Sequence, residues 1–171
     1  MNYLITGGCG FIGCNFIRRL FAEDADVHVT NIDKLTYAGS EENLADIAAT
    51  AADRYRFIKA DIGDATAVEE IIAGGKFDIL INFAAESHVD RSIASPADFV
   101  SANIVGTANL LQSAREHEIP RYVQISTDEV YGSLGDTGYF TEETPIAPSS
   151  PYSASKASAD LLVLAAFHTY G

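Results

Sequence analysis

Tyr152 and Lys156 are the two residues whose types and spacing most directly suggest chemistry. They lie four residues apart in an expected helix, so their side chains share one face of it. A free tyrosine hydroxyl has a pKa near ~10 and is a poor base at neutral pH. A lysine ammonium ~4 Å away would lower that pKa by up to about 3. The pair could then take the proton of a sugar hydroxyl while hydride leaves the same carbon for a nicotinamide cofactor.

Two adjacent carboxyl groups, Asp128 and Glu129, form a second candidate site. They follow Ser126 and Thr127 at the end of an expected strand. Ligands of open α/β folds bind at the carboxyl edge of the sheet, where these side chains would lie. The two carboxyl groups could simply belong to a solvated turn. Beside a reactive tyrosine, however, they offer one acid and one base.

A cluster of glycines separates the first expected strand from the first expected helix. Gly7, Gly10 and Gly13 are each three residues apart, which differs from G-x-G-x-x-G, but counted from Gly8 the loop has that spacing as well. Glycine allows a tight turn and lets a pyrophosphate approach the positive end of a helix. A tight turn alone would also explain the cluster, but its place between strand and helix favours phosphate binding.

An acidic residue, Asp33, ends the second expected strand, 20 residues after Gly13. A carboxylate there can accept hydrogen bonds from adenosine ribose hydroxyls and would repel the additional phosphate of NADP. A strand-end aspartate that caps a turn is the alternative. Asp61 and Ile62 follow the third expected strand, where an adenine edge would lie, although aspartate is also common in turns. The glycine loop and Asp33 together predict NAD binding.

Strands and helices alternate along the chain, which predicts an α/β fold with a doubly wound parallel sheet, the Rossmann fold. This fold has six strands, whereas the sequence offers about five and stops on a helix. We therefore expect one truncated domain over residues 1–171. The expected strands are 3–6, 27–32, 55–58, 78–81 and 121–126; helices are expected through Phe16–Leu20 and over 41–51, 68–72, 97–117 and 153–170, with a loop over 132–151.

The composition indicates an ordinary globular protein, with 47% hydrophobic and 20% charged residues. The net charge of -13 disfavours nonspecific binding to nucleic acid or anionic membranes. No apolar stretch approaches the ~20 residues needed to span a bilayer. The histidines lack metal-ligand spacing, so we expect no metal. Cys9 and Cys14 suggest small, buried, reduced side chains, and a cytoplasmic setting is expected.

Over its whole length the sequence resembles the extended short-chain dehydrogenase/reductase family. Within that family it is most similar to the nucleotide-sugar 4,6-dehydratases, above all those that act on dTDP-glucose. The Thr127-Asp128-Glu129 triplet discriminates these from the wider family. The motifs that carry the resemblance are TGGCGFIG at 6–13, DKLTYAG at 33–39, AAESHVDRS at 84–92, STDEVYG at 126–132 and YSASK at 152–156.

The resemblance implies a reaction that ends in a 4-keto-6-deoxy sugar. Tyr152 takes the C4 hydroxyl proton while hydride passes from C4 to NAD. Glu129 then removes the C5 proton, Asp128 protonates the departing C6 hydroxyl, and hydride returns to C6. Thr127 would bind the 4-hydroxyl of the nucleotide sugar, and Ser87 would also contact the substrate.

The resemblance also implies contacts with NAD and a homodimer paired through the helices at 97–117 and 153–170. Family members continue into a further sheet segment and a substrate-binding lobe, so we expect that lobe to be missing here. Cys9 replaces a common alanine, and Ala102 replaces an expected hydroxyl residue near the cofactor. The implied NAD contacts are Gly7, Gly10, Phe11, Ile12, Gly13, Asp33, Lys34, Leu35, Thr36, Asp61, Ile62, Phe83, Ala84, Ala85, Ser87, Tyr152 and Lys156.

Three other functions remain open from the sequence. A UDP-sugar 4,6-dehydratase would carry the same motifs, because the nucleotide pocket lies outside this chain. A sugar-nucleotide 4-epimerase shares the glycine loop, Tyr152 and Lys156, but it returns hydride to C4 and needs no Asp-Glu pair for elimination. A non-catalytic NAD-binding module would describe the chain acting by itself.

Overall fold

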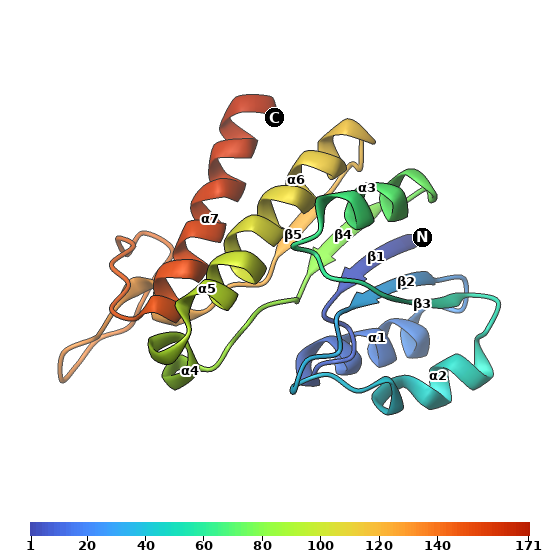
Figure 1. Ribbon diagram of the computed structural model, residues 1–171, viewed down its shortest axis with the longest axis horizontal. Coiled ribbons are helices and arrows are strands. Elements are labelled where there is room, and N and C mark those ends of the chain that lie inside the picture. Colours follow the sequence, from blue (N-terminus) through green and yellow to red (C-terminus); the bar gives the residue numbers. More distant parts are fainter.

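The expected doubly wound sheet is confirmed by a computed structural model that describes all of residues 1–171. Five parallel strands lie in the order β3-β2-β1-β4-β5 (Figure 1). The order reverses between β1 and β4, and in such sheets a ligand crevice opens at the carboxyl ends of the strands where the order reverses. The strands are β1 (Asn2–Thr6), β2 (His28–Asp33), β3 (Tyr55–Lys59), β4 (Ile79–Asn82) and β5 (Tyr122–Gln124).

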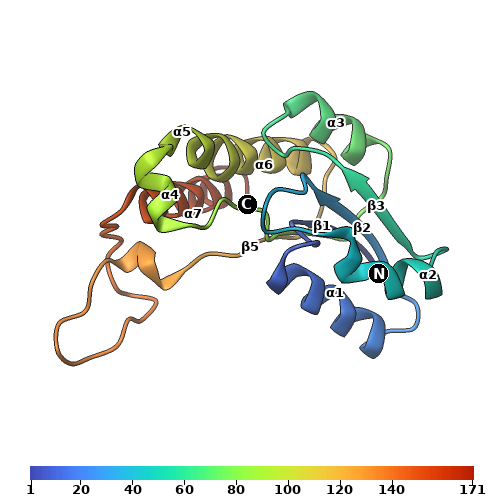
Figure 2. The ribbon, with the colours of Figure 1, turned by 60° about the horizontal axis from the view of Figure 1, so that its bottom comes forward.

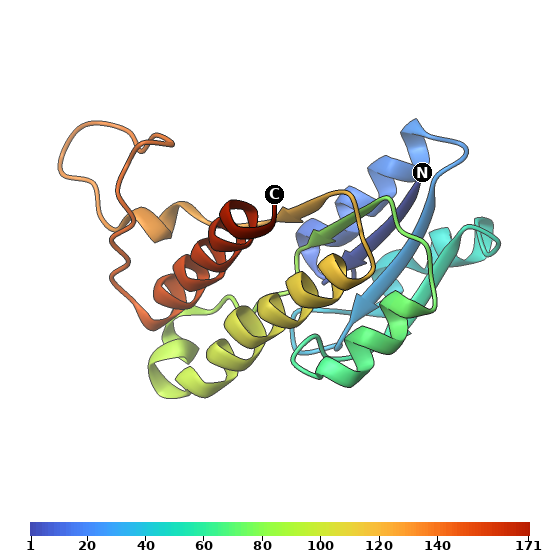
Figure 3. The same cartoon turned by 90° about the horizontal axis from the view of Figure 1, so that it is seen from above.

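Helices cover both faces of the sheet. On one face lie α1 (Phe11–Glu23), the 3-10 turn η1 (Glu41–Leu44) and α2 (Ala45–Thr50). On the other face lie α3 (Ala65–Ala73) and α6 (Gly106–Glu116). The long helix α7 (Pro151–Tyr170) packs beside α6, as Figure 3 shows.

Two separate apolar cores hold these layers together. Successive residues of a strand point to opposite faces, so Leu4 of β1 belongs to the core under α3 and α6, whereas Ile5 belongs to the core under α1. Both side chains are completely buried. The first core also includes Ile32, Val68, Ile72, Leu80 and Leu110, and the second includes Ile17, Val27, Val29, Leu44 and Tyr55.

The long helix expected over 97–117 is divided into three parts in the structure. A short helix α5 (Pro96–Phe99) leads into a π-helical turn η2 (Val100–Val105), and α6 follows. Such π-helical turns interrupt regular α-helices and are frequent at functional sites. Thr107, in the first turn of α6, donates its hydroxyl to the carbonyl oxygen of Asn103 in the π-helical turn at 2.7 Å. The strand expected over 121–126 is also shorter, since β5 ends at Gln124.

Helix α7 begins where its capping residues place it. Ser150 and Ser153 form a capping box, in which the Ser150 hydroxyl accepts from the Ser153 backbone N–H at 3.0 Å. Pro151 occupies the first helical position, where its fixed backbone angle suits a helix start. Tyr152 therefore lies in the first turn of α7. The preceding loop, residues 133–149, projects away from the sheet (Figure 2).

None of the helices has both the length and the hydropathy required to cross a bilayer.

The glycine loop supplies a stability prediction. Gly7 has φ +70, and a Cβ at this position would lie 2.5 Å from the backbone nitrogen of Ala84. We expect Gly7→Ala to destabilise the fold by about 2–5 kcal/mol, because backbone strain and overpacking add. Gly138 is the matched control, since it has φ +111 but nothing within 4 Å of an added Cβ. Thermal unfolding of both variants tests this; equal midpoints would contradict the role of the close contact.

Candidate functional site

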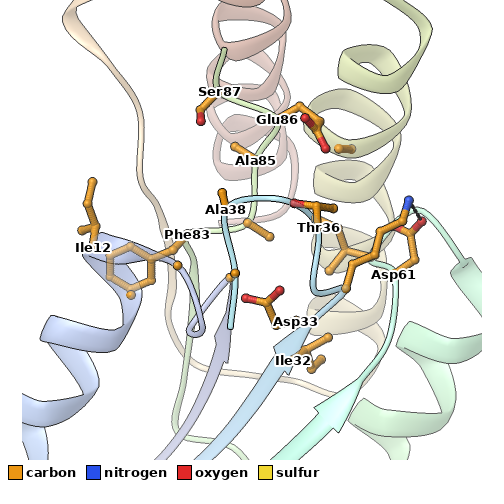
Figure 4. Close-up of a pocket in the computed structure, with 18 of the residues that line it drawn as sticks. Ile12, Ile32, Asp33, Thr36, Ala38, Asp61, Phe83, Ala85, Glu86 and Ser87 are labelled. Atoms are coloured by element: carbon orange, nitrogen blue, oxygen red, sulfur yellow. Dashed lines mark ion pairs between the residues drawn. The ribbon is translucent and has the colours of Figure 1, made fainter. Parts of the chain in front are cut away.

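A cleft of about 390 Å³ lies at the carboxyl edge of the sheet. Figure 4 shows Asp33 near its centre, with Ile12 and Phe83 on one side and Asp61 on the other. Leu35, Tyr152 and Lys156 do not line this cleft, although each was expected to contact a cofactor. The expected residues that do line it are Gly7, Gly10, Phe11, Ile12, Gly13, Asp33, Lys34, Thr36, Asp61, Ile62, Phe83, Ala84, Ala85 and Ser87.

The side chain of a buried asparagine supports the glycine loop. Asn31 on β2 accepts a hydrogen bond from the Gly8 N–H at 3.0 Å and donates to the Tyr55 hydroxyl at 3.0 Å. Gly10 precedes α1, and a Cβ there would meet nothing closer than 3.4 Å. The N-terminus of a 13-residue helix is thus left accessible to an anion. The sequence carried a signal for Asn31, a polar residue inside an apolar strand, that our prediction did not use.

The Asp33 carboxylate is fixed by two backbone donors. It accepts hydrogen bonds from the N–H groups of Cys9 at 2.9 Å and Leu35 at 2.8 Å. Leu35 has φ +59, a left-handed conformation that turns the chain directly after β2. This turn explains why Leu35 supports Asp33 through its backbone and leaves the cleft lining to Lys34 and Thr36.

An ion pair joins the ends of β2 and β3 at one end of the cleft. Lys34 Nζ lies 2.5 Å from Asp61 Oδ2, and the Gly63 N–H donates to Asp61 Oδ1 at 2.9 Å (Figure 4). Burial alone would raise the pKa of Asp61, but the bonds from Lys34 and Gly63 outweigh it and lower that pKa. The Lys34 side chain is 59% exposed, so this pair contributes little stability and chiefly orients the two side chains.

Asn103, in the π-helical turn, connects the cleft wall to α7. Its side chain accepts from the Glu86 N–H at 2.9 Å and donates to the Glu86 carbonyl at 3.0 Å and to Ser155 Oγ at 2.8 Å. Glu86 itself lines the cleft, and its Oε2 is buried without a hydrogen-bond partner. The sequence did not indicate these bonds, because they link segments far apart in the chain.

Tyr152 and Lys156 are both buried on α7, at 8% and 4% exposure. Lys156 Nζ donates to the carbonyl oxygen of Ile125 at 2.5 Å, and burial lowers the pKa of Lys156. Burial raises the pKa of Tyr152; a hydrogen bond from Thr127 opposes this, while the charge of Glu129 adds to it. The expected lowering of the tyrosine pKa by Lys156 is therefore wrong for the free protein, because desolvation of the phenolate dominates.

The triplet Thr127, Asp128 and Glu129 follows β5 and enters the 3-10 turn η3 (Asp128–Tyr131). Thr127 caps this turn, because its Oγ1 accepts from the Glu129 N–H at 3.3 Å. Both carboxyl groups are exposed and close enough to Tyr152 for their charges to raise its pKa. The structure thus brings the triplet and Tyr152 together, as expected, but next to the cleft rather than within its lining.

Comparisons with known proteins agree with this arrangement. The family described as GDP-mannose 4,6 dehydratase matches residues 4–171. The chain belongs to this family. A dTDP-glucose 4,6-dehydratase of Xanthomonas campestris pv. campestris strain B100 is 49% identical over 179 residues, covering 99% of this chain and 50% of that protein. The enzyme of that name from Neisseria meningitidis serogroup B is 50% identical, covering 98% and 49%.

Solved structures show the same relationship. The dTDP-glucose 4,6-dehydratase of Streptomyces venezuelae, crystallised with NAD bound, has a TM-score of 0.92 and 48% identity, covering 100% of this chain and 53% of that one. A UDP-Glc/GlcNAc 4-epimerase of Campylobacter jejuni has a TM-score of 0.90 but only 30% identity, covering 99% and 50%. The fold is shared with epimerases, and the chain spans about half the length of the relatives it matches.

No group of three or more His, Cys, Asp or Glu side chains is arranged to hold a metal ion. Cys9 and Cys14 are both free and buried, and burial raises the pKa of the Cys9 thiol to about 12.

Proposed function

We propose that this protein is an NAD-dependent hydro-lyase that converts dTDP-glucose to dTDP-4-keto-6-deoxyglucose. The observation that carries this proposal is the placement of Asp128 and Glu129 beside Tyr152 at the end of β5. Oxidation at C4 needs one base, whereas elimination needs a further acid and base. The two relatives at 49% and 50% identity, both called dTDP-glucose 4,6-dehydratase, support this choice of substrate.

The cleft suits NAD. The accessible N-terminus of α1 at Gly10 would hold the pyrophosphate, with Phe11 and Ile12 beside it. Asp33 would accept hydrogen bonds from the adenosine ribose, and Asp61 would lie at the adenine edge. The related enzyme of Streptomyces venezuelae was crystallised with NAD. When bound, NAD would accept the hydride from C4 and return it to C6, so it would be regenerated in each cycle.

The residues next to the cleft would move the protons. Tyr152 takes the C4 hydroxyl proton; because its pKa is raised in the free protein, ligand binding must first favour its phenolate form. Glu129 then removes the C5 proton, which the C4 ketone has acidified, and Asp128 protonates the C6 hydroxyl as it leaves as water. Thr127 and Ser87 would contact the sugar.

We further propose that residues 1–171 form one NAD-binding domain. The nucleotide of the substrate would be held by the half of the relatives' length that this chain does not match. A 4-epimerase remains the second candidate, because an epimerase shares the fold at a TM-score of 0.90. It would make no use of Asp128 and Glu129. The two free cysteines support a reducing, cytoplasmic setting.

A homodimer would use the paired helices α6 and α7. Four large hydrophobic side chains of α7 are exposed: Leu161 at 53%, Leu164 at 49%, Phe167 at 66% and Tyr170 at 63%. Val105, at the start of the same layer, is 43% exposed. Exposed apolar surface along one helix is typical of a subunit interface.

Cofactor preference is the first functional prediction. Calorimetric titration should give tighter binding of NAD than of NADP, because Asp33 would repel the additional phosphate. Asp33→Asn should reduce this preference by about tenfold or more, through the loss of a charged acceptor. Asp136→Asn, an exposed loop residue, is the control. Binding of NADP that equals or exceeds that of NAD in the wild-type protein would refute the assignment.

The division of chemical steps is the second prediction. With dTDP-glucose, Tyr152→Phe should nearly abolish NADH formation in a single turnover. Glu129→Gln should still form NADH but should exchange the C5 proton with solvent deuterium far more slowly. Glu143→Gln, an exposed loop variant, should behave as wild type. Normal C5 exchange in Glu129→Gln would remove Glu129 as the base, and parallel assays with UDP- and GDP-sugars fix the nucleotide.

Dimerisation is the third prediction. Sedimentation equilibrium should show a dimer, and the double variant Leu161→Lys/Leu164→Lys should be monomeric because charges cannot be buried in that interface. Leu134→Lys is the matched control, since Leu134 has a similar exposure of 46% but lies in the projecting loop. A wild-type protein that stays monomeric at high concentration argues against the dimer.

A further inference from the structure

Two side chains one helical turn apart connect α7 to the end of β5. Lys156 Nζ donates to the carbonyl oxygen of Ile125 at 2.5 Å. Asp160 lies four residues further along the same face of the helix and accepts a hydrogen bond from Ser126 Oγ. The two residues held on the strand side, Ile125 and Ser126, are consecutive. Helix α7 therefore holds the chain at the point where β5 ends.

Residues 125 and 126 lie between the cleft and the two carboxyl groups of Asp128 and Glu129. Ile125 lines the cleft, and Ser126 is followed directly by Thr127, Asp128 and Glu129. Tyr152 is carried by α7 itself. The covalent path from Glu129 to Tyr152 runs through the loop 133–149, which projects away from the sheet (Figures 1 and 2) and is bonded to η3 through the Ala147 N–H and the Val130 carbonyl oxygen at 3.0 Å. The separation of the two groups therefore depends in part on how α7 docks on residues 125 and 126, in addition to the bonds that hold its first turns to Ser92 and Asn103.

The chemistry of Asp160 suits this docking role. The carboxyl group is about half buried, and its side-chain hydrogen-bond partner is Ser126. Burial raises the pKa of Asp160, while the hydrogen bond from Ser126 and the ammonium of Lys156 oppose that rise. A hydroxyl that donates to a carboxylate forms a shorter and stronger bond than one between neutral groups. Asp160 does not line the cleft, and its carboxylate is engaged by Ser126, which suits a residue that orients its neighbours.

We infer that Asp160 is a positioning residue: through the hydrogen bond from Ser126 it holds Thr127, Asp128 and Glu129 in place relative to Tyr152. The catalytic consequence of this inference rests on the proposed dehydratase function. The effect of Asp160 on the structure around η3 does not depend on that function.

The first test measures amide hydrogen exchange in the turn η3. The N–H groups of Val130 and Gly132 bond to the carbonyl oxygens of Thr127 and Glu129 at 3.4 and 3.2 Å. Asp160→Ala and Ser126→Ala should each speed their exchange by about tenfold, since each removes the same hydrogen bond. The double variant should exchange no faster than either single one.

Two further variants show whether the hydrogen bond is responsible. Asp160→Asn keeps an acceptor oxygen for Ser126 and should stay within about threefold of wild type, because a neutral acceptor still forms an ordinary hydrogen bond. Ser158→Ala removes another hydroxyl of α7, one that bonds only to the Ala154 carbonyl oxygen, and should leave the exchange in η3 unchanged.

The second test measures turnover of dTDP-glucose by the same variants. In Asp160→Ala and Ser126→Ala, kcat should fall by about tenfold while KM changes less than about twofold and NAD affinity is unchanged. Asp160→Asn should retain most of the wild-type kcat. The inference would be overturned if Asp160→Ala left the amide exchange rates in η3 unchanged, or if the effects of Asp160→Ala and Ser126→Ala on exchange added in the double variant. It would also be overturned if Asp160→Asn lost as much kcat as Asp160→Ala. If the wild-type protein forms no keto sugar but the exchange pattern holds, the dehydratase proposal fails and the positioning role of Asp160 stands.

Discussion

The close approach of two backbone segments between β1 and β4 is the constraint on which the rest of the site depends. Gly7 turns with φ +70 directly against the backbone of Phe83 and Ala84, where a side chain would have no room. Here the strand order reverses, so the chain leaves β1 and β4 toward opposite faces of the sheet and a cleft opens between them. The N-terminus of α1 and the wall at 83–87 both take their places from this contact.

Burial shifts the pKa values of Tyr152 and Lys156. Tyr152 has a raised pKa and Lys156 a lowered one, so desolvation favours the uncharged form of each. The ammonium of Lys156 is satisfied by the Ile125 carbonyl in the free protein. The helix spacing of the two residues was enough to locate them, but it could not reveal that burial raises the pKa of Tyr152 or that Lys156 bonds to the Ile125 carbonyl oxygen.

The sequence predicted the parts of the fold and of the cleft that depend on local patterns of residues. Apolar runs alternating with helical periods indicated the parallel sheet, and the glycine loop and Asp33 lie at the cleft as their positions suggested. The π-helical turn was not predictable, because Asn103 bonds to Glu86 and Ser155, which are 17 and 52 positions away. The conformation of Leu35 was unpredictable for a similar reason: its left-handed backbone accompanies a bond to Asp33 that residue type alone does not indicate.

The projecting segment 133–149 is a place where the chain can change in length during evolution. It joins Glu129 to Tyr152 as a tether, while the docking of α7 on β5 fixes their geometry through side chains. The entropy of closing a flexible loop rises only slowly with its length. Insertions and deletions in the exposed part of this segment would therefore shift Glu129 and Tyr152 little. A surface element could be lengthened, shortened or exchanged there without rebuilding the centre it connects.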